Sequence, residues 1–316
     1  MHIYTFIGSY FERFLIGRHF TMPPTTTLSK PRSALVVSAE AAFCRLLSFL
    51  TCGVPLPLPL PMAVLLSRDL SLWRLRRRCT VAVMNALVLW DVDHTLIENS
   101  GVSKETYAGA FELLAGVPAE HRAKTGGRTD PEILGDLLVD HGYDPASFAP
   151  AQMAEALTES LRSRQAALAE RGYALPGGRT AIDALAQIAG VTQSVLTGNL
   201  RANAIGKLAP FGLDRGLDWD CGGFGFDAPR RWDLVGVAQQ RAAAKHGATF
   251  TEANTVLIGD TINDVLAGQR GGAKVIAVAT GSDSIDELRD AGATTVLADL
   301  EDTAAVVEAV EKAVSA

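Results

Sequence analysis

Five short, mostly apolar runs alternate with helical patterns after residue 84, and this alternation constrains the fold more than any other feature. A run of four or five such residues bounded by polar ones is typical of a strand buried on both faces. The runs are Leu87–Trp90, Gln193–Thr197, Thr255–Gly259, Lys274–Val278 and Thr294–Leu297. Strands of this kind separated by helices predict a doubly wound α/β fold with a parallel sheet. We expect the strand order 3-2-1-4-5, counted along the chain.

The alternation is interrupted directly after the first expected strand. Residues 102–175 contain only helical patterns. Asp130-Pro131 starts one expected helix, and Ala149-Pro150 starts another that runs to Gly172, because proline is favoured at the first helical position. We therefore predict a mostly helical cap inserted into a catalytic core. The predicted parts are a cap at residues 102–175 and a core at residues 84–101 and 176–316.

The first 83 residues follow a different pattern and are left out of the fold prediction. They are basic, whereas the rest is acidic enough to bring the net charge of the chain to −6. They contain the proline run Pro55–Pro61 and lack the about 20 unbroken apolar residues of a membrane span. We interpret residues 1–83 as a disordered tail or an over-extended translation before Met84. The alternative is a targeting element whose Arg74–Arg78 cluster lies at an anionic membrane surface.

Charge and cysteine content exclude several classes for the acidic part of the chain. Nucleic-acid binders present clustered positive charge, which this part does not supply. Cys221 is the only cysteine after Met84, so a disulfide framework is excluded there. A zinc finger is excluded too, because the sequence has neither a CxxC motif nor a Cys/His cluster. These features predict a cytoplasmic protein that binds no nucleic acid.

Two carboxylates, Asp91 and Asp93, follow the first expected strand. The ligand crevice of an open parallel sheet lies beyond the carboxyl ends of its strands. A carboxylate at that place can attack phosphorus and form an acyl phosphate. A second one can protonate the leaving group and then deprotonate water. The alternative is that an aspartate at a strand end only caps a turn.

Further polar residues follow the second and third expected strands. Thr197-Gly198-Asn199 offers a hydroxyl and backbone N–H groups that can bind phosphoryl oxygens. Asp260 and Asp264 follow the third strand in a GDxxxD pattern. Several carboxylates beside a phosphate repel one another unless a hard cation such as Mg²⁺ binds among them. For Asp264 the alternative is an ordinary helix-start residue favoured by the helix dipole.

These motifs resemble those of the haloacid dehalogenase-like superfamily, and most closely its phosphoglycolate-phosphatase-type members with a helical cap. The resemblance covers about residues 86–300. It rests on DxDxT at Asp91–Thr95 together with GDxxxD at Gly259–Asp264. Both motifs occur in the expected order, and each follows an apolar strand. A doubly wound core with an inserted helical cap is the fold that the resemblance implies.

The resemblance also implies the hydrolysis of a small-molecule phosphomonoester through an aspartyl-phosphate on Asp91. Asp93 would be the acid/base, and Thr197 would bind the phosphoryl group. The implied Mg²⁺ ligands are Asp91, the carbonyl of Asp93, Asp260 and Asp264. A sugar-phosphate mutase, a haloacid dehalogenase and a non-catalytic binding module remain alternatives. Asp93 argues against the dehalogenase, which lacks the second acid and needs no metal.

Two departures from the family pattern concern a glycine and a lysine. His94 stands where the family usually has glycine, and we expect its side chain to point to solvent. The family has a lysine that neutralises charge on the nucleophile and the phosphate. It often precedes a proline shortly before the GDxxxD strand, and no Lys-Pro occurs there. Lys207, on the helix expected after the second strand, is our first candidate for this cation, as a catalytic and phosphate-binding residue. Arg230, Arg231 and Lys245 follow as weaker candidates.

In the predicted cap, Gly126-Gly-Arg-Thr-Asp130 resembles the segment that reaches over the substrate in this family. Arg128 has a planar fork that can bind a carboxylate or a second phosphate, so we predict that it contacts the substrate. Asp130 stands where the N-cap is expected before Pro131, so we predict that it caps the helix. The motifs leave the individual substrate and the oligomeric state open.

Overall fold

The computed structural model describes residues 85–315, so the interpretations of residues 1–83 lie outside the described part. The strands are β1 (Ala86–Trp90), β2 (Ile97–Glu98), β3 (Tyr173–Ala174), β4 (Val191–Thr197), β5 (Gly223–Phe224), β6 (Thr255–Gly259), β7 (Lys274–Val278) and β8 (Thr295–Leu297). The α-helices are α5 (Val102–Ala115), α6 (Asp130–Asp140), α7 (Pro150–Ser163), α8 (Gln165–Arg171), α9 (Gly178–Ala186), α10 (Arg201–Leu208), α11 (Asp233–His246), α12 (Ile262–Gly271), α13 (Ile285–Asp290) and α14 (Thr303–Ser315). Short 3₁₀ turns lie at Pro145–Ser147, Ala209–Phe211 and Glu252–Asn254.

Within residues 85–315 the main sheet has six parallel strands in the order β5-β4-β1-β6-β7-β8. The doubly wound α/β fold is thereby confirmed. The expected order 3-2-1-4-5 is wrong, because the five strands predicted from the sequence lie in the order 2-1-3-4-5. The third of them, β6, pairs with β1 through Trp90 and Ile258 and does not lie beyond β4. That edge is occupied by β5, whose two residues are too few to leave an apolar run in the sequence.

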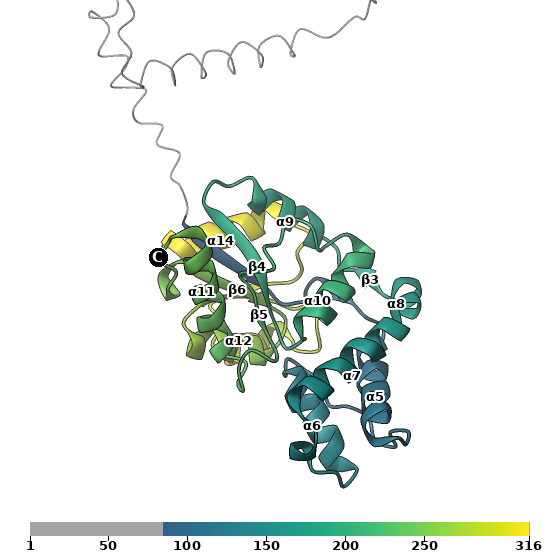
Figure 1. Ribbon diagram of the computed structural model, residues 1–316. Coiled ribbons are helices and arrows are strands. Elements are labelled where there is room, and N and C mark those ends of the chain that lie inside the picture. The colour runs from purple at the N-terminus through teal and green to yellow at the C-terminus, as the bar shows by residue number, and fades with distance from the viewer. Residues whose placement is uncertain (1–84, 316) are drawn as a thin grey trace, which may run out of the picture. The chain divides into compact units, whose positions relative to one another are not determined.

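Alternate residues of β1 pack against helices on opposite faces of the sheet (Figure 1). Val88 and Trp90 belong to a buried cluster with side chains of α9 and α14. Leu87 and Leu89 pack instead with side chains of α11 and α12. Burial of apolar surface stabilises a fold by about 25 cal/mol per Å². Packing on both faces therefore fixes the position of β1, and with it the backbone of the residues that follow the strand.

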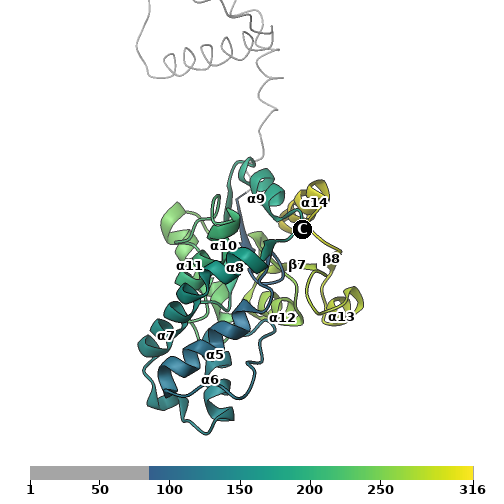
Figure 2. The ribbon, with the colours of Figure 1, turned by 90° about the vertical axis from the view of Figure 1, so that its right-hand side faces the viewer.

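Helices α5 to α8 follow β2 and form a layer of their own, called here the helical layer (residues 102–171). Figure 2 shows α5, α6 and α7 gathered at one end of the described part, whereas α8 lies beside α10. Their shared core includes Phe111, Leu134 and Leu157. The single helix expected from residue 149 to 172 is wrong, because the backbone leaves the helical conformation at Arg164 (φ −108°). There the guanidinium binds the carbonyl of Ser160 (2.9 Å).

Two short strands join the helical layer to the main sheet. β2 and β3 pair in antiparallel fashion, with Ile97 opposite Ala174 and Glu98 opposite Tyr173. The chain therefore enters and leaves the helical layer at one point, called here the neck. In the part of the chain that the structure describes, every helix is too short or too polar to cross a lipid bilayer.

Candidate active site

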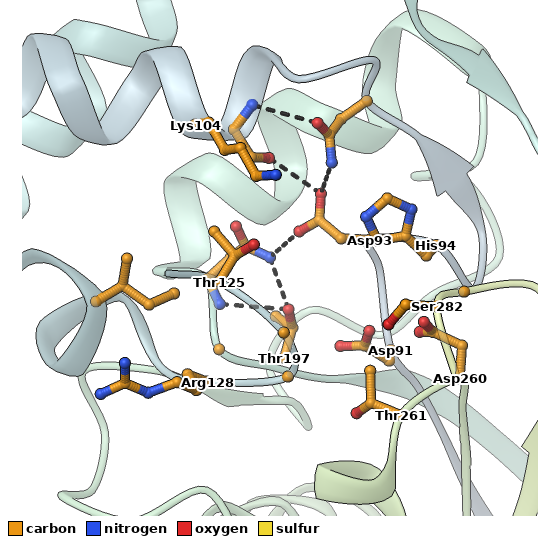
Figure 3. Close-up of a pocket in the computed structure, with 18 of the residues that line it drawn as sticks. Asp91, Asp93, His94, Lys104, Thr125, Arg128, Thr197, Asp260, Thr261 and Ser282 are labelled. Atoms are coloured by element: carbon orange, nitrogen blue, oxygen red, sulfur yellow. Dashed lines mark hydrogen bonds between the residues drawn. The ribbon is translucent and has the colours of Figure 1, made fainter. Parts of the chain in front are cut away.

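The carboxyl ends of β1, β4 and β6 bring Asp91, Thr197 and Asp260 to a pocket of about 450 Å³. Tyr107 and Arg128 of the helical layer line the same pocket, so both the layer and the sheet contribute to it. Figure 3 shows Arg128 on the opposite side of the pocket from Asp260. β1 and β6 are in register up to this point, since the Asp91 N–H donates to a carbonyl of β6 (2.8 Å). The pocket thus lies where an open parallel sheet is expected to bind its ligand.

Asp91 is 5% exposed and is held by a buried arginine. Arg231 Nη2 donates to Asp91 Oδ1 (2.8 Å) and to Asp264 Oδ1 (2.5 Å). Burial outweighs the attraction of Arg231 and raises the pKa of Asp91 to about 7, and repulsion by Asp264 adds to the rise. Although burial disfavours the charge of Arg231, the two carboxylates raise the pKa of its guanidinium. The arginine therefore stays charged between two acids.

Asp260 has one bonded and one free carboxylate oxygen. Thr95 Oγ1 donates to Oδ1 (2.9 Å), whereas Oδ2 is buried without a hydrogen-bond partner among the described residues. Burial, followed by the charges of Asp91 and Asp264, raises the pKa of Asp260. Oxygen atoms of these three aspartates lie within 4.8 Å of one another. A buried acceptor without a donor, beside two further carboxylates, fits a hard divalent cation such as Mg²⁺.

Asp93 is turned away from the other carboxylates in Figure 3 and is surrounded by hydrogen-bond donors. Its Oδ1 accepts from Asn99 Nδ2 (2.9 Å), Ser103 Oγ (3.2 Å) and Lys207 Nζ (2.9 Å). Its Oδ2 accepts from Asn199 Nδ2 (2.8 Å) and Lys207 Nζ (2.7 Å). Burial alone would raise the pKa of Asp93, but Lys207 and Asn199 lower it to about 2. In this arrangement Asp93 is therefore an ionised carboxylate.

Lys207 and Arg231 are both buried in the site, but they bind different carboxylates. The contact with the expected nucleophile, assigned above to Lys207, is made by Arg231. Lys207 binds Asp93 and the side-chain carbonyl of Asn199 (2.6 Å). The structure thus places Arg231, and not Lys207, against Asp91, because the loop before α11 folds over the end of β1. Neither Arg230 nor Lys245 lines the pocket; they pair with acidic residues elsewhere.

Thr197, Gly198 and Asn199 all line the pocket at the end of β4. The Thr197 hydroxyl accepts from Asn199 Nδ2 (2.8 Å). Gly198 lies against the helical layer, where an added Cβ would come 1.9 Å from the carbonyl oxygen of Arg128. Only glycine therefore fits at this position. The side chain of Asn199 is already engaged with its neighbours, so Thr197 is the better placed of the two to meet a phosphoryl oxygen.

Asp130 does not cap α6, contrary to expectation. Thr129 is the N-cap, and its N–H and hydroxyl both donate to Glu132 (2.9 and 2.8 Å). The cap lies one residue earlier because Thr129 has the extended backbone of an N-cap, whereas Asp130 is already helical. The buried Asp130 carboxylate instead accepts from the Tyr107 hydroxyl (2.7 Å) and the Leu200 N–H (2.8 Å). Asp130 thus joins two helices of the layer to the start of α10.

Arg128 and His94 both line the pocket and pair with nearby acids. Arg128 Nη1 binds Asp136 of α6 (2.8 Å). His94 Nδ1 lies 2.9 Å from Glu98 Oε2, and its side chain is 43% exposed, so it stands at the rim of the pocket and not wholly in solvent. The backbone of His94 has a φ of +63°, in the left-handed region that glycine adopts most easily. This explains why glycine is usual there.

Several solved structures share this fold. A hydrolase from Pseudomonas syringae is 21% identical over 71% of this chain and 99% of its own, with a TM-score of 0.51. A predicted phosphatase from Clostridium acetobutylicum is 16% identical over 71% and 99%, with a TM-score of 0.51. A β-phosphoglucomutase from Clostridium difficile is 12% identical over 74% and 100%, with a TM-score of 0.52. At these identities the likeness concerns the fold alone.

The sequence itself matches a family model. The curated proteins contain no match to the chain. The model of the haloacid dehalogenase-like hydrolases, however, matches residues 88–269, which is more than half of the 316 residues. This stretch contains the last three residues of β1, the helical layer, β4 and β6, and with them all the aspartates described above. The chain belongs to the haloacid dehalogenase-like hydrolases.

Proposed function

We propose that this chain hydrolyses small phosphomonoesters with the help of Mg²⁺, through an aspartyl-phosphate on Asp91. The observation that carries the proposal is the buried convergence of Asp91, Asp260 and Asp264, with an unpaired oxygen on Asp260. Transfer of a phosphoryl group requires a nucleophile, a hard cation and positively charged side chains at one place. Membership in a hydrolase family supports the proposal.

Asp91 is the proposed nucleophile. Its carboxylate attacks phosphorus, a bond forms between oxygen and phosphorus, and the alkoxide of the substrate leaves. Water then cleaves the acyl phosphate and releases inorganic phosphate, so that Asp91 returns to its starting form. Arg231 orients Asp91 through Oδ1 and offsets part of the negative charge that the substrate brings. Thr197 is the proposed contact to the transferring phosphoryl group.

The proposed ligands of Mg²⁺ are Asp91, the carbonyl of Asp93, Asp260 and Asp264. When bound, Mg²⁺ neutralises charge on the carboxylates and the phosphate and so lowers the barrier to attack. Asp260 offers its free Oδ2. Both oxygens of Asp264 are hydrogen-bonded, one to Arg231 and the other to the hydroxyl of Thr261 (2.6 Å), so Asp264 has to give up one of these partners to coordinate Mg²⁺.

Asp93 is the proposed acid/base. It has to give a proton to the leaving alkoxide and later take one from water. The present contacts favour its ionised form and direct it away from Asp91. We therefore propose that Asp93 leaves Lys207 and Asn199 when substrate binds. Lys207 is then a positioning residue that holds Asp93 between turnovers.

Residues 102–175 are the proposed cap, and residues 84–101 and 176–316 are the proposed core. The cap provides one wall of the pocket, with Arg128 on it. Arg128 pairs with an exposed aspartate, Asp136, and such exposed pairs contribute little stability. Arg128 can therefore exchange this partner for a carboxylate or a second phosphate of the substrate at low cost.

The test is a screen of small phosphomonoesters with Mg²⁺, with EDTA in a parallel set. Asp91→Asn should abolish turnover and leave the fold intact, because an amide does not attack phosphorus. Asp286→Asn, at an exposed residue of α13, is the matched control and should keep full activity. Ca²⁺ should inhibit, because its larger and looser coordination shell suits in-line transfer poorly.

Two outcomes of the screen would contradict the proposal. Retention of more than a few per cent of turnover in Asp91→Asn would rule out the covalent mechanism. Full activity after exhaustive chelation would point to dehalogenase chemistry instead. The screen should include sugar phosphates with a trace of the bisphosphate, because isomerisation without release of phosphate would identify a mutase.

A further inference from the structure

A second group of metal-binding side chains lies where the turn before β5 meets the end of α11. Asp218, Cys221 and His246 each place one donor atom within 4.8 Å of the others. None of them lines the pocket described above. The sequence shows no Cys/His cluster, and a zinc finger was excluded for that reason. In the fold, however, a cysteine and a histidine that are far apart in the sequence lie close together. The structure brings His246 to Cys221 across 25 positions of the chain.

The three donor atoms converge on one point. His246 Nε2 lies 3.6 Å from Cys221 Sγ and 3.1 Å from Asp218 Oδ2. Tetrahedral zinc has sulfur at about 2.3 Å and nitrogen or oxygen at about 2.0 Å, which places its ligands roughly 3.3–3.6 Å apart. The distance from Nε2 to the sulfur falls in this range and the distance to the carboxylate oxygen is slightly shorter, so a small shift would bring all three atoms around one ion.

The turn that carries Asp218 and Cys221 is well held by backbone contacts. The Asp218 N–H donates to the carbonyl of Gln193 (2.7 Å), and the Asp218 carbonyl accepts from Ser194 Oγ (2.6 Å) and from the Cys221 N–H (3.0 Å). Two ligands separated by two residues match the short spacing of zinc-binding turns. His246 is the last residue of α11 and supplies the third ligand from a regular element.

Lys245 orients the carboxylate of Asp218 from the other side. Its Nζ donates to Asp218 Oδ1 (2.7 Å) and to Asp220 Oδ2 (2.9 Å), which leaves Asp218 Oδ2 facing His246. Metal-binding carboxylates are commonly hydrogen-bonded in this way.

We propose that Asp218, Cys221 and His246 bind one Zn²⁺ ion, with water as the fourth ligand. Sulfur and imidazole ligands favour zinc, whereas the all-carboxylate set in the pocket favours Mg²⁺, so the two sites select different ions. Cys221 is buried, but the side chain of His246 is 38% exposed, so an ion can reach the site from solvent. Binding releases the thiol proton to solvent and changes no oxidation state.

The proposed zinc site joins the two ends of the segment that carries Arg231. Cys221 precedes β5 and His246 ends α11, while Arg231 lies between them and binds Asp91. An ion that links the two ends restricts the unfolded chain and also stabilises the folded state by mass action. Zinc should therefore raise the melting temperature whether or not the chain has phosphatase activity.

The experiment titrates the full-length chain with Zn²⁺ and with Co²⁺ in the presence of excess Mg²⁺. We expect one equivalent to bind, with a thiolate-to-cobalt absorption band and a rise in melting temperature. Cys221→Ser should lose the band, and His246→Gln should bind at least about 10-fold more weakly. His121→Gln, at an exposed histidine of the helical layer, is the matched control and should bind as the wild type does.

Three outcomes would overturn the proposal. One is the absence of saturable Zn²⁺ binding by the wild-type chain. Another is an unchanged band and melting shift in both Cys221→Ser and His246→Gln. The third is loss of the band when Cys44, Cys52 and Cys79 are all changed to serine, since this would assign the ion to those cysteines. If Cys221→Ser fails to fold, the exposed His246→Gln decides the question alone.

Discussion

Asp91 and Asp93 are two residues apart in the chain, yet their surroundings shift their pKa values in opposite directions. Burial raises the pKa of Asp91 to about 7. Lys207 and Asn199 overcome burial and lower the pKa of Asp93 to about 2. Environments that separate the pKa values of neighbouring carboxyls are typical of sites in which the two groups have different chemical roles.

Removal of the carboxylate at Asp91 should stabilise the metal-free protein above neutral pH. A carboxyl group whose pKa is raised by folding lowers stability above that pKa, and this cost disappears as the pH falls to the unfolded value near 4. We expect Asp91→Asn to melt at least about 3 °C above the wild type at pH 8 in EDTA. The difference should shrink towards pH 5. If Asp91→Asn and the wild type gave the same melting curve at pH 8 and again at pH 5, this would contradict a raised pKa at Asp91.

Substitution of the two buried cations should separate their roles. Arg231→Met removes the partner of Asp91, so we expect turnover to fall by about 10²–10³-fold, the usual loss for one group that stabilises charge in the transition state. Lys207→Met frees Asp93 and should cost less. Arg230→Met, at an exposed neighbouring arginine, is the control and should change little. A larger loss in Lys207→Met than in Arg231→Met would restore the ranking expected from the sequence.

The acidic residues of the site could be predicted from the sequence, but most of their partners could not. Asp91 and Asp260 each follow an apolar run of strand length, and the end of a parallel strand has a known position in the fold. Arg231 follows β5, which is too short to be visible in the sequence. Asn99 and Ser103 are ordinary polar residues, and only the folded chain brings them to Asp93.

At the scale of elements, α6 is joined to the sheet by its first residue. The Asp130 N–H donates to the carbonyl of Gly198 (2.7 Å), and its carboxylate accepts from Leu200 and Tyr107. Asp130 is 2% exposed, so the contact is made away from water, and this burial raises the pKa of Asp130. The helical layer is therefore attached to the end of β4 by polar contacts that exclude solvent.

Loss of the Asp130 carboxylate should weaken this attachment. Asp130→Ala leaves the Leu200 N–H and the Tyr107 hydroxyl buried without an acceptor, which should lower the free energy of unfolding by about 2 kcal/mol. Asp140→Ala, at the exposed end of the same helix, should change it by less than about 0.5 kcal/mol. Urea denaturation measures both variants. Equal effects would show that Asp130 is not a special contact.

Helix starts were predictable in the helical layer, whereas the break between two helices was not. Pro131 and Pro150 stand in the first turn of α6 and α7 as expected, because proline lacks the N–H that a first turn leaves unused. The break between α7 and α8 falls at Arg164, whose guanidinium binds the carbonyl of Ser160. Nothing in the local pattern distinguishes this arginine from others on a helix surface.

At the scale of the whole molecule, β1 is held from both sides by β4 and β6 and covered by helices on both faces. A chain shortened to start at Met84 keeps all of β1, so we expect its melting temperature and turnover to equal those of the full chain. A chain that starts at Val88 loses part of β1 and should fail to fold. A lower melting temperature for the chain from Met84, or the full-length product at a membrane in cells, would contradict the interpretation of residues 1–83.

The neck has a consequence for how such proteins diverge. Because β2 and β3 bring the two ends of the helical layer side by side, the layer can change its length and sequence while the strands on either side keep their register. The aspartates follow strands of the sheet, whereas Arg128 belongs to the layer. A change at Arg128 can therefore alter one wall of the pocket while the aspartates keep their places at the ends of the strands.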